Sequence, residues 1–146
     1  MQVWRDRQYG AALGAAPFFW LVLWWFWPAA PDPSWPLRDP TRFLLIALVY
    51  PVLEEMTFRG LLQAALYRRT WGALRFCRLS AANWVSALLF AASHLVWHAP
   101  WQALAVLGPG LVFGHFRDRY QGITPSVLLH VFYNTGFALL FVAARP

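Results

Sequence analysis

The chain has 146 residues, of which 60% are hydrophobic and only 12% are charged, and ten are tryptophans. A soluble domain is usually about one quarter charged, and several windows approach the ~20 apolar residues that cross a bilayer. This composition excludes an ordinary soluble domain and predicts a polytopic membrane protein. All 12 basic residues are arginines, and most lie between apolar segments, as the positive-inside rule places them. We therefore expect a lipid bilayer and no nucleic acid as partner.

The first predicted membrane helix covers residues 11–28. Its apolar run is longer and richer in tryptophan than a signal-peptide core, so we expect it to be retained. The proline-rich segment 28–36 cannot continue a helix. A second predicted helix covers residues 41–67, and the arginine-rich segment 68–78 follows it.

Three more membrane helices are predicted, over residues 80–98, 101–116 and 124–144. Thr124 is expected as the N-cap of the last helix, with Pro125 at its first position. The predicted fold class is therefore all-α: a polytopic membrane helix bundle of about five transmembrane helices. We expect it to form a single transmembrane domain over residues 1–146.

The arginines predict an orientation. If the N-terminus is cytoplasmic, the cytoplasmic side collects Arg5, Arg7, Arg68, Arg69, Arg75, Arg78, Arg117 and Arg119. The other side then has Arg38, Arg42 and Arg145. This bias indicates a multi-pass protein, expected in a bacterial inner membrane, with its N-terminus in the cytoplasm. An aromatic belt at the outer interface would then contain Trp24, Trp25, Trp27, Trp35, Trp97 and Trp101.

Glycine and proline positions predict packing and bending rather than chemistry. Residues 10–14 (GAALG) and 110–114 (GLVFG) have the small-xxx-small spacing of close helix packing. Gly108, Pro109 and Gly110 are expected to bend the fourth helix, and Pro51 the second. With one cysteine in the chain, an internal disulfide is excluded.

A short set of polar residues is expected within the membrane. Its members are Glu54, Glu55, Arg59, His94, His98, His115, His130 and Asn134. Glu55 and Arg59 are four residues apart, so they share a helix face and can form an ion pair. Glu54 points about 100° away from Glu55. One carboxylate is therefore expected to be structural, and the other to be available for a different task.

Two further pairs repeat the four-residue spacing, Phe90 with His94 and His130 with Asn134. A carboxylate, two imidazoles and a carboxamide would form a hydrolytic set, with a base for water and donors for an oxyanion. Each pair by itself also has a structural interpretation, as a packing histidine, a buried ion pair or an asparagine that links helices. We interpret His98 and His115, near helix ends, as structural.

The three motifs together resemble those of the CAAX protease and bacteriocin-processing (CPBP, or ABI) family of intramembrane proteases. The family pattern is EExxxR, then FxxxH, then HxxxN or HxxxD, on successive helices. The matching residues are Glu54, Glu55 and Arg59, then Phe90 and His94, then His130 and Asn134. The resemblance covers about residues 41–144, the expected catalytic core.

The resemblance implies a glutamic-type peptidase. In that reading Glu54, helped by His94, activates a water, while His130 and Asn134 hold the oxyanion. Arg59 would orient or neutralise Glu55, with Phe90 in a supporting position. The alternative is a zinc enzyme, with Glu54, His94 and His130 as ligands, a donor set that suits catalytic zinc. Because HExxH is absent and no spacing demands a metal, no cofactor is predicted.

The compact size is similar to that of bacterial members such as myxosortases and the JDVT-CTERM enzyme, thought to process C-terminal sorting signals. The implied partner is a membrane-anchored protein substrate with a C-terminal hydrophobic segment. The implied reaction is hydrolysis of a peptide bond near that segment. The competing class is a non-catalytic membrane immunity or assembly factor with the same fold.

Overall fold

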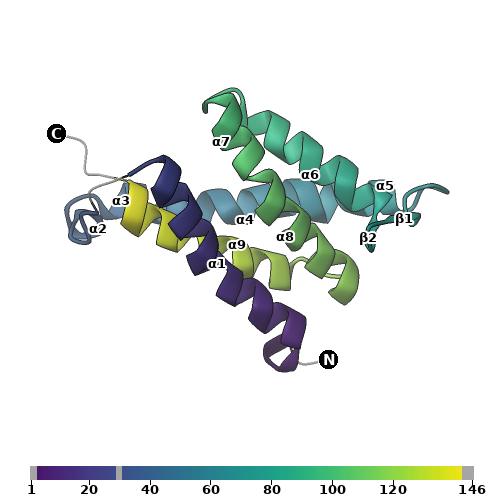
Figure 1. Ribbon diagram of the computed structural model, residues 1–146. Coiled ribbons are helices and arrows are strands. Elements are labelled where there is room, and N and C mark those ends of the chain that lie inside the picture. The colour runs from purple at the N-terminus through teal and green to yellow at the C-terminus, as the bar shows by residue number, and fades with distance from the viewer. Residues whose placement is uncertain (1–2, 29–30, 143–146) are drawn as a thin grey trace. The chain divides into compact units, whose positions relative to one another are not determined.

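A computed structural model describes residues 3–28 and 31–142. Its elements are helices and one short hairpin (Figure 1), which confirms the predicted all-α class. The chain divides into two compact units, Met1–Val52 with Leu128–Pro146, and Leu53–Val127. The expected end of the last helix at residues 143–144 and the predicted outer Arg145 lie outside the described residues.

The first unit begins with a short 3-10 helix, η1 (Val3–Arg5), and the long helix α1 (Arg7–Phe26). The side chain of Asp6 caps α1 by accepting a hydrogen bond from the backbone N–H of Gln8 at 3.0 Å. A Cβ added at Gly10 or Gly14 would meet no described atom within 4 Å. The predicted close packing at residues 10–14 is therefore wrong for the part of the chain described.

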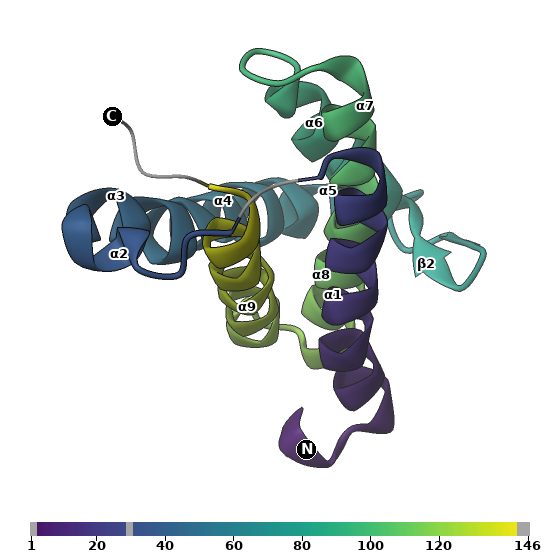
Figure 2. The same cartoon turned by 60° about the vertical axis from the view of Figure 1, so that its left-hand side comes forward.

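Helix α9 (Thr124–Phe141) is the centre of the first unit, where it lies between α1 and the α2–α3 segment (Figure 2). The indole N–H of Trp20 donates to the carbonyl of Tyr133 at 3.2 Å, and the Tyr133 hydroxyl donates to the carbonyl of Ala12 at 2.9 Å. Gly136 leaves room for the Trp20 ring, which a Cβ there would overlap. These contacts hold α1 against α9.

Trp35 opens α2 (Trp35–Arg38) and is fully buried. Its indole N–H donates to the carbonyl of Ala138 on α9 at 2.9 Å. The prediction that Trp35 belongs to an interfacial belt is therefore wrong, because an internal acceptor for the N–H allows the whole ring to be buried. Trp25 and Trp97, by contrast, are both exposed.

The predicted helix over residues 41–67 is helical without interruption from residue 40 to residue 67. It consists of α3 (Pro40–Leu44), η2 (Leu45–Val49), α4 (Tyr50–Glu55), η3 (Met56–Gln63) and α5 (Ala64–Tyr67). Both η2 and η3 are π-helical, a form that is rare and often found at functional sites. The boundary between the two units falls inside α4, between Val52 and Leu53.

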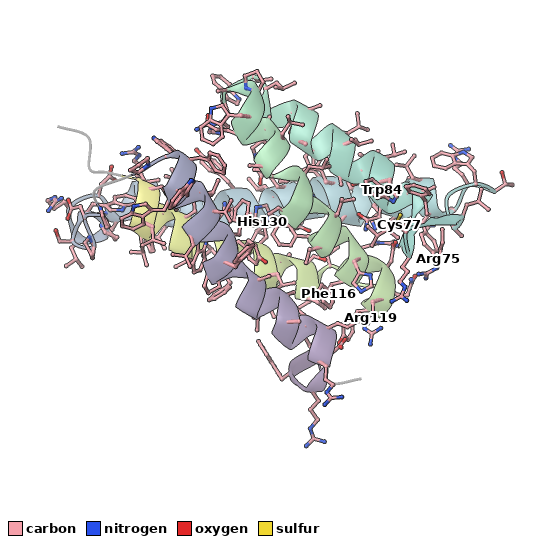
Figure 3. All side chains as sticks on the ribbon, in the orientation of Figure 1. Arg75, Cys77, Trp84, Phe116, Arg119 and His130 are labelled. Atoms are coloured by element: carbon pink, nitrogen blue, oxygen red, sulfur yellow. The ribbon has the colours of Figure 1, made fainter. Side chains whose placement is uncertain are left out.

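In the second unit, α5 leads into an antiparallel hairpin of β1 (Arg75–Phe76) and β2 (Leu79–Ser80). Its two turn residues, Cys77 and Arg78, have φ values of 49° and 67°. Positive φ at both positions matches the twist of a two-residue hairpin. The indole N–H of Trp84 donates to the carbonyl of Phe76 at 3.1 Å, and Figure 3 shows Trp84 beside the hairpin.

Three helices complete the second unit: α6 (Ala81–His94), α7 (Pro100–Ala105) and α8 (Leu107–Tyr120). Helix α6 packs against α8 and η3. The predicted third helix ends at His94, so His98 lies outside it. The predicted fourth helix is divided at Val106, one residue before α8, rather than at Pro109. Pro109 fits in the first turn of α8, where its missing N–H leaves no helical bond unmade.

Two described helices, α1 and α9, are long and apolar enough to cross a membrane. Helix α6 has 14 residues, which correspond to about 21 Å at 1.5 Å per residue, against a hydrocarbon core of about 30 Å. Helical segments occupy all five predicted regions, but a count of five crossings stays a prediction.

The predicted close packing at residues 110–114 is confirmed. A Cβ at Gly110 would lie 3.2 Å from the Phe90 ring, and one at Gly114 would overlap Asn83 and lie 2.8 Å from Gln63 Oε1. These two glycines let α8 approach its neighbours closely.

Substitution of Gly114 should therefore destabilise the second unit. We expect Gly114→Ala to lower the free energy of unfolding by about 1–3 kcal/mol through overpacking, measured as a fall in melting temperature in detergent micelles. The matched control is Gly14→Ala, which adds the same methyl group to α1 in open space and should be neutral or stabilising by up to about 1 kcal/mol. Equal melting temperatures for the two variants would contradict this packing.

Candidate active site

Glu55 and Arg59 form a buried ion pair. The distance between Arg59 Nη1 and Glu55 Oε1 is 3.5 Å, and both side chains are 0% exposed. The pair predicted from their four-residue spacing is confirmed. Arg59 also donates from Nη2 to the backbone carbonyl of Gly110 on α8 at 2.8 Å. One buried cation thus links the α4–η3 helix to α8.

Phe90 supplies the third contact of Arg59. The guanidinium carbon lies 4.5 Å from the centre of the Phe90 ring and 5.9 Å from that of Phe113. A cation over an aromatic face is stabilised by the ring quadrupole, more strongly where water is excluded. The phenylalanine of the second motif therefore contacts the arginine of the first.

The two adjacent glutamates have different surroundings. Glu55 is completely buried against Arg59, whereas Glu54 is half-buried. A step of one residue turns the side chain by about 100° around an α-helix, and the two carboxylates therefore face different surroundings. That one carboxylate is structural and the other serves another task stays a prediction.

His94 is the last residue of α6 and is half-buried. Its Nδ1 lies 2.9 Å from the carbonyl oxygen of Phe90. Because a carbonyl only accepts, Nδ1 carries the hydrogen, and in the neutral ring the lone pair is on Nε2. The hydrogen bond therefore fixes a tautomer whose free nitrogen can accept a proton or bind a metal.

His98, which we interpreted as structural, lies beside His94. The two rings are nearly parallel, with 5.8 Å between their centres. Their spacing of four residues could have indicated this proximity. His115 lies on α8, where its ring contacts that of Phe116 at 5.1 Å between centres.

His130 and Asn134 lie on the part of α9 that belongs to the first unit. His130 is buried, and Figure 3 shows it on α9. Asn134 donates from Nδ2 to the carbonyl of Ile46 in η2 at 3.1 Å. The structure thus brings Asn134 to the second predicted helix. Convergence of this pair with Glu54 and His94 stays a prediction.

Two buried amides are missing from the set of polar residues that we expected within the membrane. Gln63 and Asn83 are both completely buried. Gln63 donates from Nε2 to the Gly114 carbonyl and to Asp118 Oδ1, both at 2.9 Å. Asn83 donates from Nδ2 to the Leu111 carbonyl at 2.9 Å. The helix face of Gln63 could have been predicted from the sequence, because Gln63 lies four residues after Arg59 and so shares the helix face of the Glu55–Arg59 pair.

The zinc alternative combines residues of both units. It needs Glu54 and His94 from one unit and His130 from the other. Nε2 of His94 is suited in chemistry to a zinc ligand. No group of three histidine, cysteine or acidic side chains that could hold a metal was found in residues 3–28 and 31–142. Whether activity depends on zinc is therefore to be tested with a chelator.

The buried ion pair predicts a large effect of removing one partner. Arg59→Met leaves a buried carboxylate without its cation and should destabilise the protein by about 3–5 kcal/mol, measured by thermal unfolding in micelles. The double variant Glu55→Met with Arg59→Met should recover much of this loss, because both charges are then gone. Arg69→Met, at an exposed position, is the control and should have little effect. A double variant no more stable than Arg59→Met would contradict the pairing.

The sequence was also compared with known proteins. A family model described as type II CAAX prenyl endopeptidase Rce1-like matches residues 36–136. The matched region is well over half of the chain and contains all three motifs. Searches of curated proteins and of solved structures found no match.

Proposed function

Because the chain belongs to the Rce1-like family of type II CAAX prenyl endopeptidases, we propose that it is an intramembrane endopeptidase in which a glutamate activates the attacking water. Membership of this family implies a peptidase embedded in a membrane. The observation that best supports the glutamate mechanism is the division between Glu55, buried against Arg59, and Glu54, which is half-buried. Such a division places one carboxylate of the motif in the interior and the other at a position that is partly accessible.

In the proposed mechanism, Glu54 accepts a proton from water while the water oxygen bonds to the carbonyl carbon of the substrate. His94 assists through Nε2, the nitrogen left available by the Nδ1–Phe90 hydrogen bond. His130 and Asn134 donate to the oxyanion, and one well-placed donor contributes about 3–4 kcal/mol to such a transition state. The proton then passes to the leaving nitrogen as the C–N bond breaks.

The proposed substrate is a protein with a C-terminal hydrophobic membrane segment and a basic tail, as in sorting-signal systems of the myxosortase or JDVT-CTERM type. The surroundings of Glu54 support an apolar substrate. Its neighbours on the helix, Leu53 and Met56, are large apolar residues that are 53% and 50% exposed. An apolar segment could lie against them and bring a peptide bond to the carboxylate.

We also propose five membrane crossings in a bacterial inner membrane, with a cytoplasmic N-terminus. The excess of arginines on one side of the predicted helices supports this orientation. The two apolar helices α1 and α9 are compatible with it.

Removal of the proposed base or of an oxyanion donor should stop cleavage. We expect Glu54→Gln and His130→Ala each to lower the cleavage rate by about 10²–10⁴-fold or more, measured on a co-expressed membrane substrate. Both proteins should remain folded by circular dichroism. Asp32→Asn, at an acidic residue in the segment before α2, is the control and should cleave normally. Normal turnover by either of the first two variants would exclude the assigned role.

A chelator distinguishes the metal alternative. A glutamic-type enzyme should keep its rate in the presence of a chelator, whereas loss of activity that zinc restores would favour the metalloprotease. If no tested substrate is cleaved even by the wild type, the non-catalytic membrane factor becomes the better description.

The substrate proposal predicts dependence on both parts of the sorting signal. Polar replacements in the hydrophobic segment should reduce cleavage at least ~10-fold, because burial of the segment contributes about 0.8 kcal/mol per CH₂ group. Serine in place of the basic residues of the tail should also reduce cleavage at least ~10-fold, because each of these charges contributes about 1 kcal/mol near an anionic surface. The measurement is the ratio of cleaved to intact substrate in membranes. Equal cleavage of a substrate with neither feature would contradict the proposal.

A further inference from the structure

The π-helical segment η2 has a gap in its backbone hydrogen bonding that the sequence creates. The backbone N–H of Tyr50 donates to the carbonyl of Leu45, five residues earlier. The next bond of this ladder would join residue 51 to the carbonyl of Ile46. Residue 51 is a proline, which has no backbone N–H. The Ile46 carbonyl therefore cannot receive its bond from the helix.

Asn134 supplies that missing donor. Its Nδ2 lies 3.1 Å from the Ile46 oxygen and donates to it, as a backbone N–H at residue 51 would otherwise do. Ile46, Pro51 and Asn134 all belong to the first unit. A carbonyl without a helical donor costs free energy when it is kept from water, so this contact stabilises both partners. It also decides which end of the amide faces the helix, because only the nitrogen can donate.

We infer that Pro51 is a positioning residue for Asn134, which it orients by leaving the Ile46 carbonyl open. This inference rests on the proposed function, in which Asn134 donates to the oxyanion. The amide nitrogen has two hydrogens; one bonds to Ile46, and the second is directed away from it. If the amide rotated by 180°, it would present its oxygen, and an oxyanion would meet an acceptor instead of a donor.

Isotope-edited infrared spectroscopy can test the hydrogen bond without any assay of turnover. Isoleucine occurs at positions 46 and 123, so labelling with 1-¹³C-isoleucine marks only two carbonyls. The Ile123 carbonyl accepts from the backbone N–H of Val127 at 2.9 Å and serves as an internal reference. Ile123→Val removes its band and assigns the other one to Ile46.

Asn134→Leu, of similar shape but without a donor, should shift the Ile46 band to higher wavenumber. In the Pro51→Ala background a backbone N–H is restored at position 51, so the same Asn134→Leu change should shift the band much less. An unchanged band in the proline background, or equal shifts in both backgrounds, overturns the inference. If the Asn134→Leu variant does not fold, which a shift and broadening of the Ile123 reference band would reveal, Asn134→Ala removes the same donor.

Cleavage kinetics then test the consequence. Pro51→Ala should lower kcat about 10-fold with little change in KM, because a misdirected donor weakens the transition state rather than substrate binding. The matched control is Pro17→Ala, at the proline inside α1, which should leave kcat unchanged. A normal kcat for Pro51→Ala would overturn the positioning role. If the infrared shifts occur but the wild type cleaves nothing, the Pro51–Ile46–Asn134 arrangement stands and the proposed function fails.

Discussion

A single buried cation constrains the second unit. Arg59 is completely removed from solvent, and an ion in such a place must recover the free energy of its lost hydration. It does so through a carboxylate on its own helix, Glu55, a backbone carbonyl on α8, Gly110, and an aromatic ring on α6, Phe90. Because the three partners come from different helices, those helices must pack in one register for the charge to be tolerated.

The glycines of α8 make this register possible. Gly110 and Gly114 are four residues apart, as are the two buried donors Arg59 and Gln63, and each donor bonds to the carbonyl of one glycine. A side chain at either glycine would keep the helices too far apart for these bonds. The two glycines and the two donors therefore form opposite sides of one helix–helix interface. The chemistry proposed for Glu54 depends on this interface.

The first unit uses backbone carbonyls in the same way. Tyr133 and Trp35 each donate to a carbonyl of a neighbouring helix, and Asn134 donates to one that Pro51 leaves open. In a medium without water, each exposed carbonyl needs a protein donor, and such acceptors set the direction of the polar side chains that reach them. The open carbonyl of Ile46 in η2 therefore sets the orientation of the Asn134 amide.

Composition alone determined that this is a membrane-type chain, and a spacing of four residues determined the Glu55–Arg59 pair, because neighbours on one helix face meet whatever surrounds them. The burial of Trp35 and of Gln63 was decided only by the tertiary structure. So was the acceptor of Asn134. Their partners are carbonyls on other helices. Whether such a carbonyl can accept a bond from a side chain depends on helix packing and on the local helix type, and a short-range pattern of side chains does not contain this information.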